Sequence, residues 1–355
     1  MEKNKNLTIE ETFNLAIKNH QEGKTDIAEE FYNQVLKIDP NHLQALNNIA
    51  IIFTNLKKYQ RAKECYEKAI EINPNYSSAH NNLGVLFKEL KENQKAKECY
   101  EKAIEINPNY ADTHYNLGNI FQELRDFQKA KEYYEKAIEI NPRYLSAYYN
   151  LGNIFKEQKE NQKAKECYEK AIDINSNHIS AHNNLGNIFQ EVGDLQKAKE
   201  YYEQAIKINP NYIDALNGLG NTFRKLKKFD EAEIILKKAI EFKPDYAESH
   251  NNLGAVLHAI GRFSEAIDKY KQAIKLKPNY VEARINLNAS TNRHVFQWHF
   301  LMMNDKFRNT KYLEAIKLAI KDVDDDSLIL DIGTGSGLLS MMAAANGAGE
   351  VIACE

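Results

Sequence analysis

The sequence has 355 residues, of which 43% are hydrophobic and 27% charged, and its formal net charge is −3 at neutral pH. This composition suits a folded protein of two or more domains, and the interleaved acids and bases exclude the one-sided basic face that nucleic-acid binding needs. No apolar stretch approaches the roughly 20 residues that cross a bilayer, and no secretory signal is visible. Four cysteines make no disulfide framework. We therefore expect a cytoplasmic protein, with the nucleus as an alternative.

A short tail, residues 1–8, precedes a 34-residue pattern that recurs eight times. Each unit carries a small residue, an alanine twelve residues later, and four further on a tyrosine, which only Leu236 replaces. All seven prolines fall at one position of the unit. The small residues are Ala16, Ala50, Gly84, Gly118, Gly152, Gly186, Gly220 and Gly254.

Each unit reads as a hairpin of two helices, because its apolar residues recur with a period near 3.6 in two segments. The small residue and the alanine mark the place where the two helices cross, and the proline ends the second helix. One hairpin cannot bury its apolar face alone, so neighbouring hairpins must stack. The predicted units are 9–42, 43–76, 77–110, 111–144, 145–178, 179–212, 213–246 and 247–280.

This spacing and residue set resemble the tetratricopeptide repeat over residues 9–280. The predicted fold is therefore mainly α, a tetratricopeptide-repeat superhelix of eight helical hairpins. A further first helix, with Ala283 and Leu287 in register, is interpreted as a capping helix over 281–296. The resemblance implies a protein or peptide partner, bound in extended form in the groove that the first helices line.

Asparagine recurs two residues before the small residue, with Gly218 as an interruption. An amide side chain donates to and accepts from a peptide backbone at once, so such a ladder could hold a chain without reading its sequence, as in the similar repeats of O-linked N-acetylglucosamine transferases. The alternative is that these amides only keep an exposed helix face polar. The candidate partner-binding residues are Asn48, Asn82, Asn116, Asn150, Asn184 and Asn252.

Other repeated polar residues suggest no separate site. The early positions of the first helices, such as Ser78 and Asp112, lack the basic residues of a carboxylate clamp, so binding of a Glu-Glu-Val-Asp tail is not expected. Metal ligands must converge from close spacings, whereas the repeated cysteines and histidines lie one per unit. We expect packing residues and no metal site at Cys65, Cys99 and Cys167 and at His80, His114, His182 and His250.

The repeat rhythm ends near residue 292, and two further segments follow. Residues 297–325 are expected to form helices and an acidic linker. Residues 326–355 read as a strand, a glycine-rich turn, a helix and a second strand, which is a β-α-β unit of a Rossmann-like α/β domain. Its loop lies at the carboxyl end of the first strand, where open parallel sheets bind ligands.

The spacing of this loop is G-x-G-x-G, with Asp331 two residues before the first glycine. A dinucleotide fingerprint needs glycine or alanine where Leu338 stands. The loop instead resembles motif I of class I methyltransferases, which implies S-adenosyl-L-methionine as cofactor; dinucleotide binding and a domain that binds nothing are the alternatives. The implied cofactor contacts are Asp331, Gly333, Thr334, Gly335, Gly337 and Glu355, the last with the ribose hydroxyls.

The runs Trp298-His299-Phe300, Asn304-Asp305 and Arg308-Asn309-Thr310 look like the N-terminal cap of protein arginine methyltransferases. That resemblance implies that Arg308 pairs with the methionine carboxylate of the cofactor. It also implies that His299 and Met302 line the cofactor pocket, although simple packing of a cap helix would also explain both.

In that family two glutamates and a histidine loop hold the arginine acceptor after the second strand, so no catalytic residue is named here. We expect the first part of an arginine methyltransferase with a truncated α/β domain, inactive as this 355-residue chain and poorly ordered over 326–355. One alternative is a tetratricopeptide-repeat scaffold with a degenerate methyltransferase region. Another is a class I methyltransferase that acts on a different acceptor.

Overall fold

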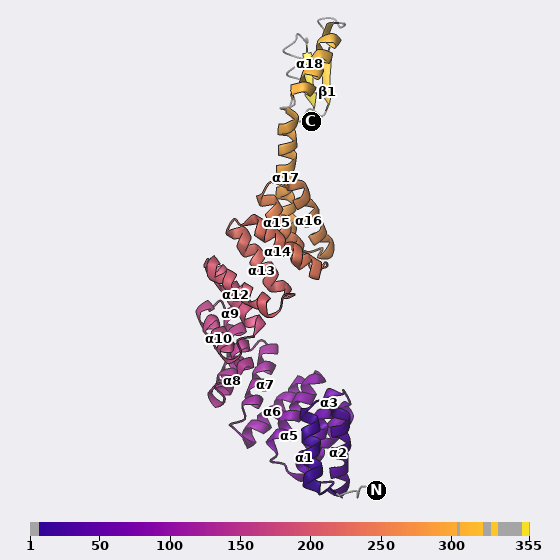
Figure 1. Cartoon of the computed structure of the whole chain (residues 1–355), viewed down its shortest axis with the longest axis vertical. Coiled ribbons are helices and arrows are strands. Elements are labelled where there is room, and N and C mark those ends of the chain that lie inside the picture. Colours follow the sequence, from indigo (N-terminus) through magenta and orange to yellow (C-terminus); the bar gives the residue numbers. More distant parts are fainter. Residues whose placement is uncertain (1–6, 304–305, 322–327, 333–349, 355) are drawn as a thin grey trace, which may run out of the picture. The chain divides into compact units, whose positions relative to one another are not determined.

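A computed structural model describes residues 7–303, 306–321, 328–332 and 350–354, with side chains described over 7–293 and 310–318. The chain divides into two compact units, Met1–Ile188 and Phe189–Glu355, each of which is described by itself. Within each unit, paired helices follow one another along the chain (Figure 1).

Sixteen of the described helices form eight hairpins. The first helices are α1 (Ile9–Gln21), α3 (Leu43–Asn55), α5 (Ser77–Glu89), α7 (Ala111–Glu123), α9 (Leu145–Glu157), α11 (Ile179–Glu191), α13 (Ile213–Lys225) and α15 (Ala247–Ala259). The second helices are α2 (Thr25–Ile38), α4 (Tyr59–Ile72), α6 (Asn93–Ile106), α8 (Phe127–Ile140), α10 (Asn161–Ile174), α12 (Leu195–Ile208), α14 (Phe229–Phe242) and α16 (Phe263–Leu276). The prediction of a mainly α tetratricopeptide-repeat array is confirmed.

The turn inside each hairpin contains one residue with left-handed backbone geometry. At φ near +60° to +85° this residue ends the first helix and turns the chain into the second. Glycine adopts this conformation without a steric penalty, yet five of the eight turns use lysine or arginine there. The residues are Gly23, Lys57, Lys91, Arg125, Lys159, Gly193, Lys227 and Gly261.

The two helices of a hairpin approach most closely at the repeated small residue. A Cβ atom added to Gly118 would lie 2.7 Å from the ring of Tyr134, which is fully buried on the second helix. The same contact recurs at Gly84, Gly152 and Gly254, each against the tyrosine of its own hairpin. The structure therefore confirms a tight crossing at the small residue and identifies the tyrosine ring as its partner.

Equivalent tyrosines differ in what their hydroxyl groups contact. The hydroxyl of Tyr134 lies 2.7 Å from Asn119 Oδ1 and 2.6 Å from Gln122 Oε1, whereas that of Tyr100 is buried without a partner among the described residues. Tyr134→Phe should therefore cost roughly 1 kcal/mol, whereas Tyr100→Phe should be neutral or stabilising, because it removes an unsatisfied buried group. Hydrogen exchange of α8 and α6 amides measures the two effects, and equal costs would contradict the assignment.

Helix α17 (Val281–Met303) packs on α16 and continues the stack. Ala283 and Ser290 are fully buried, and the Oγ atom of Ser290 lies 2.6 Å from His258 Nδ1. The helix expected over 281–296 thus runs further, to Met303. Helix α18 (Lys306–Lys321) follows it.

Two short parallel strands, β1 (Leu328–Ile332) and β2 (Glu350–Cys354), form a sheet. Asp331 pairs with Ala353 and Ile332 with Cys354. Residues 333–349, where the glycine-rich turn and helix were expected, lie outside the described residues. In the part of the chain that the structure describes, no helix is long and apolar enough to span a membrane.

Candidate functional site: the asparagine ladder and the C-terminal strand edge

The six candidate asparagines lie at one position of the first helices and are all half-buried. We call them the ladder asparagines. Because the repeat places them at equivalent points of α3, α5, α7, α9, α11 and α15, their side chains share one face of the hairpins within each unit. Each of these residues is therefore partly accessible to solvent.

Ladder asparagines donate hydrogen bonds back to the preceding repeat. The Nδ2 atom of Asn82 donates to Asn47 Oδ1 at 2.9 Å, and that of Asn116 to Asn81 Oδ1 at 3.1 Å. In the second unit, Asn252 donates to Asn217 in the same way, at 3.3 Å. Each bond joins residues 35 positions apart, so the ladder ties consecutive hairpins together.

Two repeats carry tyrosine at the position of the acceptors Asn47, Asn81 and Asn217. In these repeats a different asparagine accepts the hydrogen bond of the ladder asparagine. Asn150 donates to Asn119 Oδ1 at 3.0 Å and approaches the hydroxyl of Tyr115 at 3.2 Å. Asn184 donates to Asn153 Oδ1 at 3.2 Å and approaches Tyr149 at 3.5 Å. The asparagine after the glycine thus supplies the acceptor when tyrosine cannot.

The ladder's interruption at Gly218 has a steric counterpart. A Cβ atom there would lie 2.4 Å from the ring of Tyr202. Gln190 replaces the missing tie, because its Nε2 atom lies 3.1 Å from the carbonyl oxygen of Gly218 and 2.7 Å from the hydroxyl of Thr222. Sequence reasoning did not identify Gln190, since a single glutamine in a helix carries no distinct signal.

A further ladder residue lies on α17. Asn286 donates to Asn251 Oδ1 at 3.1 Å and so extends the series by one repeat. Sequence reasoning missed it, although its position, 34 residues after Asn252, was a readable signal.

The ladder face offers amides that are only partly used. Each asparagine has two N–H donors and one carbonyl acceptor with two lone pairs, and the hydrogen bonds described for the ladder asparagines do not use all of these positions. A backbone presents one donor and one acceptor per residue. The face can therefore bind an extended chain without recognising its side chains.

The repeated histidines and cysteines have structural surroundings. The Nε2 atom of His114 lies 2.9 Å from the carbonyl oxygen of Pro108, and burial lowers the histidine's pKa. Burial raises the pKa of Cys99 to about 11 and that of Cys167 to about 12, so these thiols stay protonated and weakly nucleophilic at neutral pH. Among the residues with described side chains, no group of three metal-ligating residues comes together.

The predicted cofactor residues lie mostly where only the backbone is described. His299 and Met302 lie in α17 and Arg308 in α18, but their side chains lie outside the described part. Asp331 lies in β1. The other predicted contacts, Gly333, Thr334, Gly335, Gly337 and Glu355, lie outside the described residues. Since Ile332 pairs with Cys354, the residues that follow the two strands start from the same sheet edge.

Comparison with known families agrees with this architecture. Models of the tetratricopeptide repeat match residues 13–42, 43–76, 77–110, 111–144, 143–211, 178–245 and 247–280. The chain is therefore a member of the tetratricopeptide-repeat family.

Similar sequences include arginine methyltransferases. The chain is 48% identical over 63 residues to the arginine N(omega)-methyltransferase of Streptomyces achromogenes subsp. streptozoticus, which is 18% of this chain and 17% of that protein. It is 49% identical over 61 residues to protein arginine N-methyltransferase 9 of Xenopus laevis, or 17% of this chain and 7% of that one. The matched part of the chain thus spans less than a fifth of these relatives.

Among solved structures, the Cut9–Hcn1 heterotetramer of the APC/C has a similar fold, with a TM-score of 0.55. It is 16% identical over 75% of this chain and 52% of that one. This likeness supports the fold alone.

Proposed function

We propose that the array binds an extended segment of a protein along the face of its first helices, and that the chain belongs to an S-adenosyl-L-methionine-dependent protein arginine methyltransferase whose substrate the array holds. The observation that carries this proposal is the 48% identity to an arginine methyltransferase in a chain that is otherwise a repeat array. A captured segment would raise the local concentration of arginine acceptors near the methyl-transfer site.

The ladder supports the binding part of this proposal. Its residues are half-buried and recur at every hairpin but one from α3 to α15. Hydrogen bonds to a peptide backbone are independent of sequence, so such a face suits an enzyme that modifies arginines in varied surroundings.

The carboxyl ends of β1 and β2 support the proposal that the chain binds S-adenosyl-L-methionine. Parallel strands bind ligands at their carboxyl ends, and the chain leaves β1 and β2 at the same edge toward Gly333 and Glu355. S-adenosyl-L-methionine would supply the methyl group. Glu355 would accept hydrogen bonds from its ribose hydroxyls, and Arg308 would pair with its carboxylate, with His299 and Met302 beside it. Glycines at 333, 335 and 337 would let the backbone approach the cofactor closely, with Thr334 in the same loop and with Asp331 and Gly333 against the methionine moiety.

The triple variant Asn116→Ala, Asn150→Ala, Asn184→Ala tests the ladder. Each lost hydrogen bond should cost roughly 0.5–1.5 kcal/mol, so the affinity for a 20-residue glycine- and arginine-rich peptide should fall at least about tenfold. Titration calorimetry with the 355-residue chain measures this effect. In the complete methyltransferase that we propose, the affinity for S-adenosyl-L-methionine should stay within about twofold, because the cofactor residues are untouched.

A control separates binding from array stability. Asn81 is only 4% exposed and accepts from Asn116, so Asn81→Ala removes an inter-repeat tie without removing a surface amide. Peptide affinity should fall in the triple variant and stay unchanged in Asn81→Ala. Unchanged affinity in the triple variant would show that the ladder only stabilises the array.

A further inference from the structure

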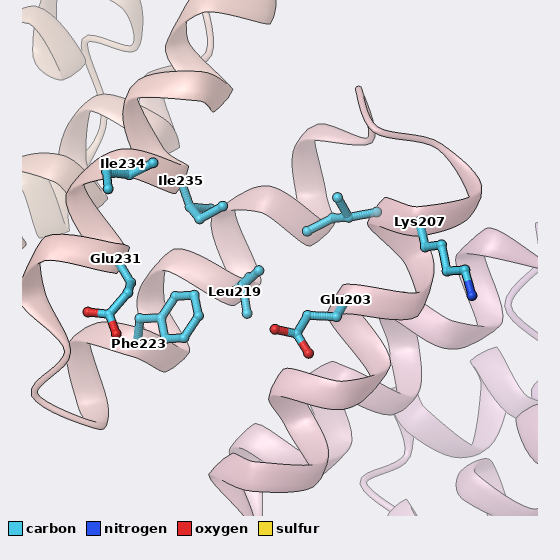
Figure 2. Close-up of a pocket in the computed structure, with 8 residues that line it drawn as sticks. Glu203, Lys207, Leu219, Phe223, Glu231, Ile234 and Ile235 are labelled. Carbon is cyan, nitrogen blue, oxygen red and sulfur yellow. The ribbon is translucent and has the colours of Figure 1, made fainter.

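A surface pocket of about 500 Å³ lies among helices α12, α13 and α14 of the second unit. We call it the repeat-7 pocket. Five apolar side chains and three charged ones line it (Figure 2). They are Ile206, Leu219, Phe223, Ile234 and Ile235, with Glu203, Lys207 and Glu231.

Five other repeats cover the equivalent phenylalanine with their own cation. Arg61 lies 4.0 Å from the ring centroid of Phe53. The equivalent lysines lie 5.1 to 5.4 Å from their ring centroids, in the pairs Lys95–Phe87, Lys129–Phe121, Lys163–Phe155 and Lys197–Phe189. These distances are those of cation–π contacts, so the ring normally has an intramolecular partner.

Repeat 7 reverses the charge at this position. Glu231 stands where repeats 2 to 6 carry the cation, and among the described residues no cation lies over the Phe223 ring. No ion pair forms with the Glu231 carboxylate within the same described part. The carboxylate is therefore left for an outside group, and the ring, which is 8% exposed, lies in the pocket without such a cation.

Repeat 7 also lacks a side-chain hydrogen bond that repeats 2 to 6 form on their second helices. In repeats 2 to 6 a glutamine donates to a glutamate four residues later, at 2.8 to 3.0 Å, in the pairs Gln60–Glu64, Gln94–Glu98, Gln128–Glu132, Gln162–Glu166 and Gln196–Glu200. Repeat 7 has Asp230 and Ile234 instead, and Ile234 is 66% exposed. An apolar wall thus replaces a hydrogen-bonded pair.

Two of the three charged residues that line the pocket are acidic. Figure 2 shows the Glu203 carboxylate turned toward the Phe223 side of the pocket and the Lys207 ammonium turned away from it. The Glu203 carboxylate also lies 3.6 Å from the Lys199 ammonium, in a partly exposed and therefore weak ion pair. A cation with an apolar stem would complement both carboxylates, the ring and the isoleucines.

We propose that the repeat-7 pocket binds an arginine side chain of a protein partner. Its guanidinium lies over Phe223 between Glu203 and Glu231, and its methylene stem packs on Ile234 and Ile235. Arg61 on Phe53 shows the arrangement within this same chain, and at 4.0 Å it is closer than the equivalent lysines. A planar guanidinium stacks on aromatic rings better than an ammonium does. The inference does not rest on the proposed function, because the ladder asparagines lie elsewhere.

The probe is the peptide acetyl-Gly-Gly-Arg-Gly-Gly-amide, titrated into the 355-residue chain and followed by isoleucine-methyl NMR. The methyl signals of Ile206, Ile234 and Ile235 should shift with a dissociation constant of roughly a millimolar. A peptide with citrulline, which is neutral and nearly isosteric, should bind at least about tenfold more weakly, because it loses the attraction to both carboxylates.

Glu231→Lys is the decisive variant. It restores the lysine that repeats 3 to 6 carry, so the chain should fold, and the new ammonium should cover Phe223 and weaken peptide binding at least about tenfold. Glu241→Lys, an exposed site on the same helix, makes the same charge change where two other repeats carry Lys207 and Lys275. It should leave the affinity within about twofold, as should the ladder triple variant.

Equal binding of the citrulline peptide would overturn the proposal, because only apolar contacts would then hold the peptide. Undiminished binding to Glu231→Lys would overturn it too. Tighter binding of the matching lysine peptide would overturn the assignment to arginine.

Discussion

Replacing Gly118 with valine should destabilise the α7–α8 hairpin by roughly 3 kcal/mol. A Cβ atom at this position would already lie 2.7 Å from two ring carbons of Tyr134, and that ring is fully buried. Valine adds two further methyl groups at a stiff, branched carbon, so the helices must separate. Hydrogen exchange of the α7 and α8 amides measures the loss, because repeats that contact only their neighbours need not unfold in one step.

Alanine at the same place is the control. Gly118→Ala should change stability by less than about 1 kcal/mol, because the gain in helix propensity offsets a small shift of the ring. The chain itself supplies the precedent, since Ala50 stands at this position in the hairpin that buries Tyr66. If valine cost no more than alanine, the glycine would not mark the closest approach of the two helices.

Replacing Tyr168 with alanine should cost roughly 3–5 kcal/mol in the α9–α10 hairpin. The side chain is fully buried, its ring contacts Gly152, and its hydroxyl donates to Asn153 Oδ1 at 2.8 Å. Alanine would leave a cavity between the helices and remove this hydrogen bond. Hydrogen exchange of α9 and α10 amides would report the change.

Two milder substitutions separate these causes. Tyr168→Phe keeps the ring and should cost roughly 1 kcal/mol, the value of one hydrogen bond. Tyr168→Leu should cost less than alanine, because Leu236 fills the equivalent space against Gly220. If leucine were as costly as alanine, the filled volume would not be the main stabilising contribution.

The repeat period was enough to predict the hairpins. Period and residue type depend on local contacts, since the small residue, the alanine and the tyrosine all act within one hairpin. Helices α1, α3 and α5 begin at Ile9, Leu43 and Ser77, where the first three predicted units begin. The end of α17 at Met303 was not predicted, because no proline or glycine marks where a terminal helix stops.

The candidate functional residues were predicted only as a pattern. The asparagine series was visible, but its hydrogen bonds join residues 35 apart, such as Asn116 and Asn81. The spacing of 35 residues is one more than the repeat period of 34, because the bond joins different positions of two hairpins that are stacked. Glu231, which stands where repeats 3 to 6 carry lysine, was not singled out, because its consequence depends on Phe223 and Glu203 from two other helices.

The sequence by itself determined the family, the positions of the hairpins and the residues at which helices cross, because these follow from periodicity and side-chain size. Only the tertiary structure decided that the ladder asparagines tie neighbouring repeats and that Gln190 bridges the break at Gly218. It also decided that no cation from the described side chains lies over Phe223 in repeat 7. The physical reason is that hydrogen bonds and pockets form between side chains of different hairpins. Their partners are fixed by how the hairpins stack, which no single repeat encodes.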